Sequence, residues 1–247
     1  MRYFIDLCYD GKPYHGWQRQ PNAVSVQQTL EEALSTLLRL PMAVVGAGRT
    51  DTGVHALQMI AHFDTPAALE VPEQLCYQLN QFLPPSIALR SIRPVEATAH
   101  ARFDAVSRSY EYRIVQQKAP FQQHTAYQLT TPLDVTAMNA AAELLLSHTD
   151  FECFSKSKTD VKTFECNITH ARWETTANGL IFTIAANRFL RNMVRAIVGT
   201  LIEVGQHKTD LKGMQQILAS KDRSAAGYSV PAQGLILTAV AYPKTIY

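Results

Sequence analysis

The sequence lacks several features that would each indicate a class of protein. It has no apolar run of about 18 residues or more, and its N-terminus has no basic stretch followed by an apolar one. It also lacks a Cys-x-x-Cys pair, a His-Glu-x-x-His motif and any Cys/His cluster with zinc spacing. We therefore expect a cytoplasmic protein without a membrane span, a signal peptide or a metal site.

Cysteine is scarce as well. Cys8, Cys76, Cys153 and Cys166 are scattered along a chain of 247 residues, which is long enough to form a core without disulfides. We interpret them as reduced thiols in the core.

The composition is that of a globular protein, with 47% hydrophobic and 18% charged residues. Since domains commonly contain roughly 100 to 200 residues, the length allows one large or two smaller domains. The net charge of +2 neither requires nor excludes a nucleic-acid partner. Basic residues gather near 90–113, 156–162 and 188–195, although each group alone is typical of a solvated surface.

Hydrophobic periodicity predicts a mixture of strands and helices. The expected strands cover residues 2–9, 42–45, 55–63, 87–95, 108–115, 166–174, 179–186 and 235–242. The expected helices cover residues 25–40, 73–82, 134–147, 189–205 and 209–219, and Ser25 with Gln28 forms a capping box for the first. This mixture indicates an α+β fold with helices on one side of a sheet. We place a domain boundary near Asp104, between residues 1–104 and 105–247.

The most informative segment runs from Gly46 to Ala56 and reads GAGRTDTGVHA. Its glycines permit a tight turn and a close approach of a ligand to the backbone, with Asp51 at the tip. A dinucleotide-binding loop would need a third glycine where Asp51 stands, and no Gly-Lys-Ser/Thr follows, so both nucleotide-loop interpretations weaken. The structural alternative is that Asp51 caps the neighbouring backbone amides.

This segment resembles the active-site signature of the bacterial tRNA pseudouridine synthase A family, which usually reads G-R-T-D-A-G-V-H-A around an aspartate nucleophile. Similarity to the family continues, in the family's order, over nearly the whole chain. The similar segments are 9–11, 16–20, 25–28, Phe63, 100–105, 108–112, 193–199 and 231–235.

The resemblance implies a fold and a function. The expected fold has two related α/β halves that share a continuous antiparallel sheet, with helices on one side and an RNA-binding cleft. The expected activity is an isomerase that converts uridine to pseudouridine at positions 38, 39 and 40 of the tRNA anticodon stem-loop. The family needs no cofactor and commonly acts as a homodimer.

The resemblance also implies roles for particular residues. Asp51 would be the nucleophile, attacking either C1′ of the ribose or C6 of the base. Arg195 would ion-pair with Asp51 and orient it, and Tyr110 would stack on the uracil and could relay a proton. Arg49 would contact the RNA, and Leu235 would lie near the uracil.

Periodicity gives Arg195 some independent support. In a helix over 189–205, Arg188, Arg191 and Arg195 would share one face, and the apolar neighbours of Arg195 would half-bury its stem. A guanidinium in that position needs an anion. For the other residues ordinary roles stay open: core packing for Tyr110 and Leu235, and a solvated loop for Arg49.

Two other functions are compatible with the same pattern. One is a tRNA-binding or RNA-folding module that has the cleft but performs no chemistry. The other is a nucleotide-binding enzyme that uses the glycine turn, which the missing loop motifs argue against.

Overall fold

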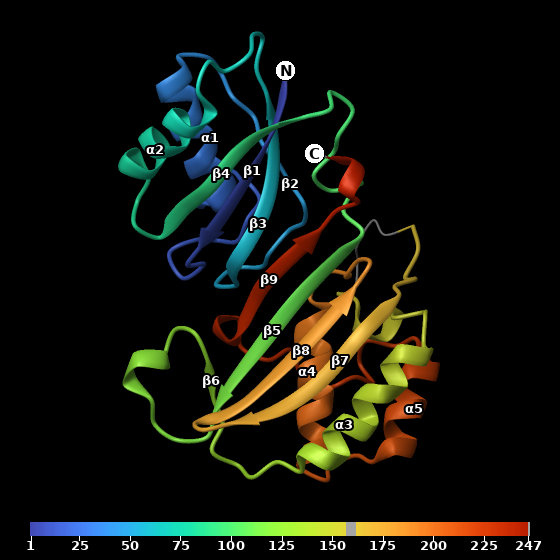
Figure 1. Cartoon of the computed structure of the whole chain (residues 1–247). Helices are drawn as coiled ribbons and strands as arrows, with labels where there is room; N and C mark the ends of the chain where they lie inside the picture. Colours follow the sequence, from blue (N-terminus) through green and yellow to red (C-terminus); the bar gives the residue numbers. More distant parts are fainter. Residues whose placement is uncertain (157–161, 247) are drawn as a thin grey trace. The chain divides into compact units, whose positions relative to one another are not determined.

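The structure is a computed structural model that describes residues 1–156 and 162–246. Within these residues the chain forms nine strands, mostly paired antiparallel, and five α-helices, which confirms the predicted α+β class. Two compact units are present, drawn in Figure 1. Unit 1 comprises Met1–Ser107 together with the chain from Leu237, and unit 2 comprises Arg108–Ile236.

Unit 1 is built around β1 (Arg2–Tyr9), which pairs antiparallel with β3 (His55–Asp64) on one side and β4 (Ile87–Val95) on the other. The short strand β2 (Val45–Gly46) pairs with β3, and β9 (Leu235–Ala241) follows β3 in the strand order. Because β1 is central, its side chains are largely buried. The segment that carries Asp51 therefore connects two strands that are both anchored in the sheet.

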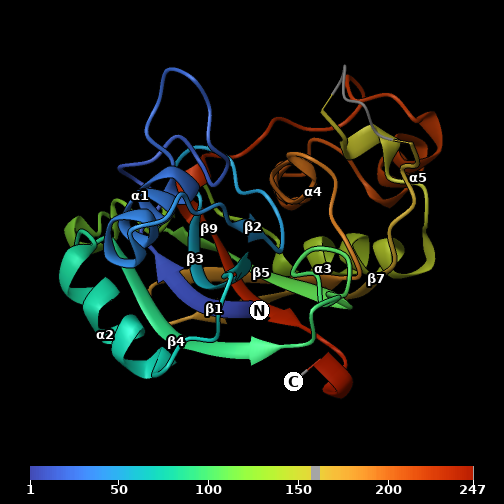
Figure 2. The same ribbon diagram turned by 90° about the horizontal axis from the view of Figure 1, so that it is seen from above.

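Two helices, α1 (Val26–Leu38) and α2 (Pro72–Phe82), lie next to each other beside these strands (Figures 1 and 2). The serine half of the predicted capping box is confirmed, since Ser25 Oγ accepts a hydrogen bond from the Gln28 N–H at 3.2 Å, whereas the Gln28 side chain donates to Glu32. The helix ends at Leu38 because Arg39 adopts a left-handed conformation with φ of 55°. Its buried face includes Leu30 and Leu34.

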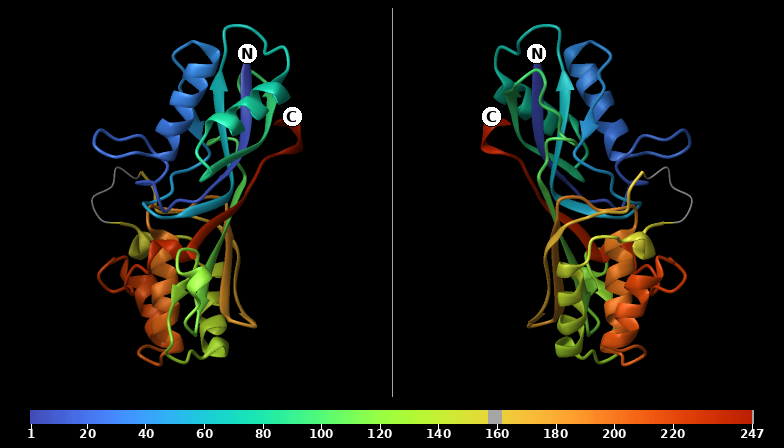
Figure 3. Two further views of the ribbon diagram at one scale, coloured as in Figure 1. Left: turned by 90° about the vertical axis from the view of Figure 1, so that its left-hand side faces the viewer. Right: turned by 90° about the vertical axis from the view of Figure 1, so that its right-hand side faces the viewer.

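Unit 2 contains the strand order β5-β8-β7, formed by β5 (Ser107–Val115), β8 (Gly179–Ala186) and β7 (Ile168–Thr176). Both neighbours of β8 run antiparallel to it, and the two-residue strand β6 (Tyr127–Gln128) pairs parallel with β5. Helices α3 (Val135–Glu143), α4 (Met193–Gly205) and α5 (Leu211–Ser220) cover one side of these strands (Figure 3). Helix α4 is the central one, with 11 of its 13 residues buried.

The expected helix over 189–205 is wrong at its N-terminus. Asn192 has φ of 67°, a left-handed conformation that cannot lie inside an α-helix, so α4 begins at Met193. Arg188 and Arg191 therefore precede the helix, and the prediction that they share a helical face with Arg195 is also wrong.

The expected strand over 42–45 is confirmed only at Val45 and is wrong at residues 42–44, for a different reason. The residues before Val45 are not in a strand, because side chains of α1 occupy their backbone groups. Val44 donates its N–H to Glu31 and accepts from Gln27, while the Met42 N–H bonds Ser35 Oγ at 2.9 Å.

The four cysteines form no disulfide. Burial raises the pKa of the Cys153 thiol to about 12 and that of Cys166 to about 11, and Cys76 is buried as well. Cys8 is only half-buried. Three of the thiols are thus in the core, as predicted.

Within residues 1–156 and 162–246, no helix is both long enough and apolar enough to cross a membrane, and no group of acidic, histidine and cysteine side chains could hold a metal ion. Most of the basic segment expected at 156–162, including Lys158, lies outside the described residues. The domain boundary near Asp104 stays a prediction. The two compact units are not two consecutive segments of the chain, because the residues from Leu237 onward belong to unit 1.

Candidate active site

The glycine-rich turn joins β2 to β3 in unit 1. Its incoming arm pairs with β3, and the Ala47 N–H then donates to the Ile60 carbonyl at 2.7 Å. At the far side the Val54 N–H donates to the Asp51 carbonyl at 3.1 Å, and Gly53 adopts φ of 78°, which favours glycine. The half-buried Asp51 therefore stands at the tip of a closed turn.

Thr50, the residue before Asp51, is held at two points. Its Oγ1 lies 2.9 Å from the hydroxyl of Tyr9, and its carbonyl accepts the Trp17 N–H at 3.1 Å. Gly16, with φ of 86°, passes so close to the Thr50 carbonyl that any side chain there would collide with it. Thr50 is only 7% exposed, and these contacts with Tyr9, Gly16 and Trp17 fix the backbone that leads into Asp51.

The Trp17 side chain packs against the turn at Gly46. The indole is 3% exposed, and a Cβ added at Gly46 would lie 2.5 Å from its ring. Trp17 thus packs against the turn. Arg49, two residues before Asp51, is exposed.

His55 begins β3 directly after the turn and is 5% exposed. Its Nδ1 accepts the Gly11 N–H at 3.1 Å and lies 3.0 Å from Asp10 Oδ1. These contacts connect the start of β3 to the segment that follows β1, which gives His55 a structural role.

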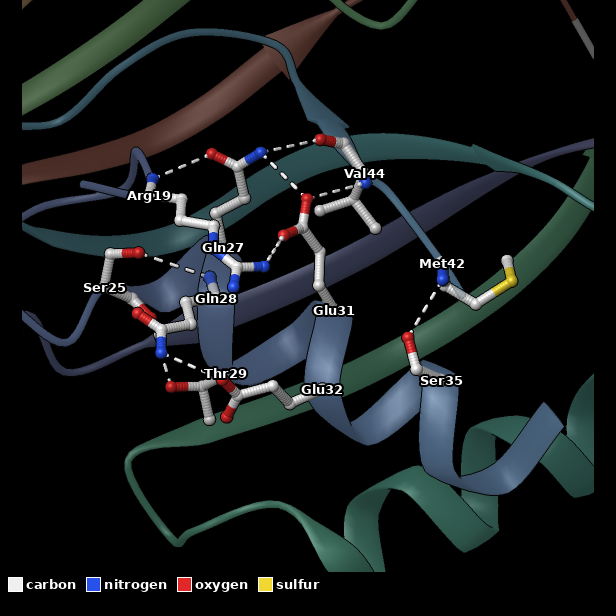
Figure 4. A network of polar contacts seen from close by, with 10 residues as sticks. All are labelled: Arg19, Ser25, Gln27, Gln28, Thr29, Glu31, Glu32, Ser35, Met42 and Val44. Atoms are coloured by element: carbon white, nitrogen blue, oxygen red, sulfur yellow. Dashed lines mark hydrogen bonds and ion pairs between the residues drawn. The ribbon is translucent and has the colours of Figure 1, made fainter. Parts of the chain in front are cut away.

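A polar network on α1 contacts the same region, and the sequence patterns did not reveal it (Figure 4). Gln27 and Glu31 connect α1 to Arg19 and to the backbone of Val44. One signal could have identified the network: Glu31 is a charged residue beside Leu30 and three positions before Leu34, on the apolar side of the helix. Tyr9, the partner of Thr50, has no comparable signal.

In unit 2, Tyr110 and Tyr112 occupy β5. Tyr110 is half-buried, and its ring meets that of Phe189 edge to face, with centroids 5.3 Å apart. Tyr112 is fully buried, its hydroxyl donates to the Pro231 carbonyl at 2.9 Å, and its ring packs against Gly234. Tyr112 therefore belongs to the core of unit 2.

Arg195 lies in the first turn of α4 and is half-buried, as expected. Its Nε donates to the Val230 carbonyl at 2.7 Å, and the Val230 N–H donates to the Arg195 carbonyl at 3.3 Å. Because Val230 is fully buried, this bond fixes the Nε side of the Arg195 guanidinium to the segment that leads to Leu235. Leu235 is 6% exposed at the first position of β9.

The predicted site residues thus divide between the two units. Asp51 and Arg49 belong to unit 1, whereas Tyr110, Arg195 and Leu235 belong to unit 2. Three of them (Asp51, Tyr110 and Arg195) are half-buried, Leu235 is buried, and Arg49 is exposed.

Comparison with known proteins relates this arrangement to one family. The model of the family described as tRNA pseudouridine synthase matches residues 8–104 and 141–243. The chain belongs to the tRNA pseudouridine synthase family. Asp51 and Arg49 lie in the first matched segment, Arg195 and Leu235 lie in the second, and Tyr110 lies between the two.

Individual members of the tRNA pseudouridine synthase family are similar over the full length. The protein named tRNA pseudouridine synthase A from Porphyromonas gingivalis is 51% identical, covering 100% of this chain and 99% of the relative. The protein of that name from Parabacteroides distasonis is 50% identical, covering 100% and 98%. The one from Bacillus subtilis is 40% identical, covering 98% and 99%.

Proposed function

We propose that this chain isomerises uridine to pseudouridine in tRNA with Asp51 as the nucleophile. The observation that carries the proposal is the family match across the glycine turn, combined with the bracing that holds Thr50 at its hydroxyl and its carbonyl. A nucleophile must be held in a reactive geometry, because misplacement by about 1 Å can reduce a rate roughly 100-fold. The turn has the local rigidity that this role requires.

The reaction rearranges bonds within one nucleotide. The glycosidic bond from N1 to C1′ breaks, the uracil rotates, C5 bonds to C1′, and the proton on C5 is lost while N1 gains one. Atoms and electrons balance within the nucleotide and water, so the reaction needs no redox cofactor. Asp51 would form a transient covalent bond to C1′ or to C6, which divides one difficult step into easier ones.

The other site residues take the roles that the resemblance implies. Arg195 would pair with the Asp51 carboxylate, and its bond to the Val230 carbonyl supports this role by restricting its side chain. Tyr110 would stack on the flipped uracil, a contact worth about 1–3 kcal/mol, and its half-buried ring suits that contact. The exposed Arg49 would contact the RNA, and Leu235 would pack near the uracil.

We further propose that the target uridines are at positions 38, 39 and 40 of the anticodon stem-loop and that the enzyme acts in the cytoplasm as a homodimer. Arginine and lysine side chains outside the site would bind backbone phosphates. The logarithm of tRNA affinity should then fall with the logarithm of salt concentration, with a slope near −0.9 per phosphate contact. Salt-insensitive binding would contradict this part of the proposal.

Release of tritium from tRNA labelled at C5 of its uridines tests the activity directly. The wild-type protein should release tritium from anticodon stem-loop uridines, and Asp51→Ala and the near-isosteric Asp51→Asn should release none. Both variants should still bind tRNA, because the phosphate contacts are unchanged.

Two outcomes would change the assignment. Binding without tritium release by the wild type would indicate the alternative function, a tRNA-binding or RNA-folding module. Release that persists in both Asp51 variants would retain the isomerase and remove Asp51 as its nucleophile.

A further inference from the structure

The catalytic turn is held by two backbone segments that are far apart in the sequence. The first, residues 16–19, contacts the Thr50 carbonyl through the Trp17 N–H at 3.1 Å. The second, residues 44–47, is the incoming arm of the turn and contains β2. The position of Asp51 therefore depends on the spacing between these two segments.

The start of α1 fixes the first segment. The Val26 N–H donates to the Gly16 carbonyl at 3.2 Å, and the Gln27 N–H donates to the Trp17 carbonyl at 2.9 Å. Such N–H groups have no partner within their own helix, so a neighbouring backbone segment can use them. Trp17 is thus bonded to α1 through its carbonyl and to Thr50 through its N–H.

The side chain of Gln27 joins the two segments (Figure 4). Its Oε1 accepts the Arg19 N–H at 3.0 Å, and its Nε2 donates to the Val44 carbonyl at 3.0 Å. One amide group therefore contacts both segments, using its acceptor on one and its donor on the other.

Glu31 orients that amide. Glu31 Oε1 accepts from Gln27 Nε2 at 3.0 Å and from the Val44 N–H at 3.1 Å, and Oε2 accepts from Arg19 Nη1 at 3.2 Å. An amide cannot rotate by 180° here without placing its oxygen against a carboxylate. The carboxylate thus selects the orientation in which Gln27 joins both segments.

The burial of the Glu31 carboxylate indicates that this network has a role other than stabilising the fold. Glu31 is 6% exposed and Val44 is 1% exposed. The ion pair of Glu31 with Arg19 contributes little to stability, because the Arg19 side chain is 57% exposed and an ion pair in contact with solvent is worth about 0–1 kcal/mol. A network of directional hydrogen bonds, in contrast, defines a single geometry.

We propose that Gln27, oriented by Glu31, is a positioning residue for Asp51. It sets the spacing between the segment that holds Thr50 and the strand that enters the catalytic turn. The inference rests on the proposed function, since it assigns Gln27 to the isomerase site.

The helix contains a matched control. Gln28 and Glu32 have the same residue types at the same spacing, and Gln28 Nε2 donates to Glu32 Oε1 at 2.8 Å on the exposed side of α1. Gln27→Glu and Gln28→Glu therefore make the same chemical change to one helix. Each places two carboxylates four residues apart, but only Gln27→Glu removes the donor to the Val44 carbonyl.

The experiment measures kcat and KM by tritium release, normalised to the folded fraction determined by circular dichroism. Gln27→Glu should lower kcat at least about tenfold and leave KM for tRNA within about twofold, since it displaces the nucleophile without removing an RNA contact. Gln28→Glu should stay within about twofold of wild type in both constants. A purely structural role for Gln27 would reduce the folded fraction without changing kcat per folded molecule.

Glu31→Gln provides a second test in case Gln27→Glu does not fold. It retains an acceptor for the Val44 N–H and removes the charge that orients Gln27, so kcat should again fall with little change in KM. The inference is overturned if the folded variants of Gln27 and Glu31 match Gln28→Glu in kcat, or if only KM changes. Failure of the proposed function is distinguishable, because the wild type itself would then release no tritium.

Discussion

The hydrogen bond between Tyr9 and Thr50 offers a quantitative test of how the turn is held. Tyr9→Phe removes the phenolic hydroxyl, and Thr50→Val replaces the threonine hydroxyl with a methyl group of similar size. The two hydroxyls are 2.9 Å apart, and the residues are 4% and 7% exposed. Each substitution alone therefore removes a hydrogen bond between two largely buried residues.

The expected magnitudes follow from that burial. A neutral intramolecular hydrogen bond contributes about 0.5–1.5 kcal/mol net, whereas an orphaned buried partner costs about 1–3 kcal/mol. Tyr9→Phe, which removes the partner of the buried Thr50 hydroxyl, should lower the free energy of unfolding by about 1–3 kcal/mol, and Thr50→Val should lower it by about 0.5–1.5 kcal/mol. The double variant should lose less than the sum of the two, with a coupling energy of about 0.5–1.5 kcal/mol.

Urea denaturation followed by circular dichroism would measure the free energies, and tritium release would measure kcat of the folded variants. Because Thr50 precedes Asp51, both single variants should also lower kcat. Tyr14→Phe is a suitable control: Tyr14 is in the same unit and its hydroxyl lies 2.7 Å from Ser86 Oγ, outside the turn. It should lose comparable stability and keep its kcat.

Additive losses would refute this reasoning. If the free energies of the two single variants add within about 0.3–0.5 kcal/mol, the hydroxyls do not interact. If Tyr14→Phe lowers kcat per folded molecule as much as Tyr9→Phe, general loosening of unit 1 explains the effect.

Two further predictions concern stability. Burial, together with the charge of Arg2, lowers the pKa of His62 from 6.5 to about 4, and its Nδ1 accepts the Ala101 N–H. Because the unfolded chain then binds the proton first as the pH falls, the free energy of unfolding should decrease from about pH 6.5 to about pH 4, by about 3 kcal/mol at most, and His62→Asn should flatten this dependence. In unit 2, a Cβ at Gly199 would collide with the Tyr228 carbonyl. Gly199→Ala should therefore destabilise the protein by about 1–3 kcal/mol, as is typical when a core is overpacked, and an unchanged urea midpoint would contradict this close contact.

Sequence patterns within one or two helical turns predicted much of the secondary structure correctly. The apolar stripe and capping residues of α1 predicted its start, because the Ser25 cap depends only on residues within one turn. The same approach failed at the start of α4, where apolar periodicity continued through Asn192 although its backbone is left-handed. Apolar periodicity indicates which residues can be buried, but it gives no information about the φ angle of a single residue such as Asn192.

The segment before β2 shows a second limit. Residues 42–45 have the composition of a strand, yet side chains from α1 bond the backbone of Val44. No local pattern could reveal this competition, because Gln27 and Glu31 approach Val44 from 17 and 13 residues away.

The sequence by itself determined the α+β class, most of the strands and helices, and the glycine turn with Asp51, because these depend on periodicity, capping and a contiguous motif. Only the tertiary structure decided how the turn is held, through Tyr9, Trp17 and the Gln27–Glu31 pair. The physical reason is that hydrogen bonds act over about 3 Å in space, whereas the residues that make them are separated along the chain by distances that no local pattern encodes.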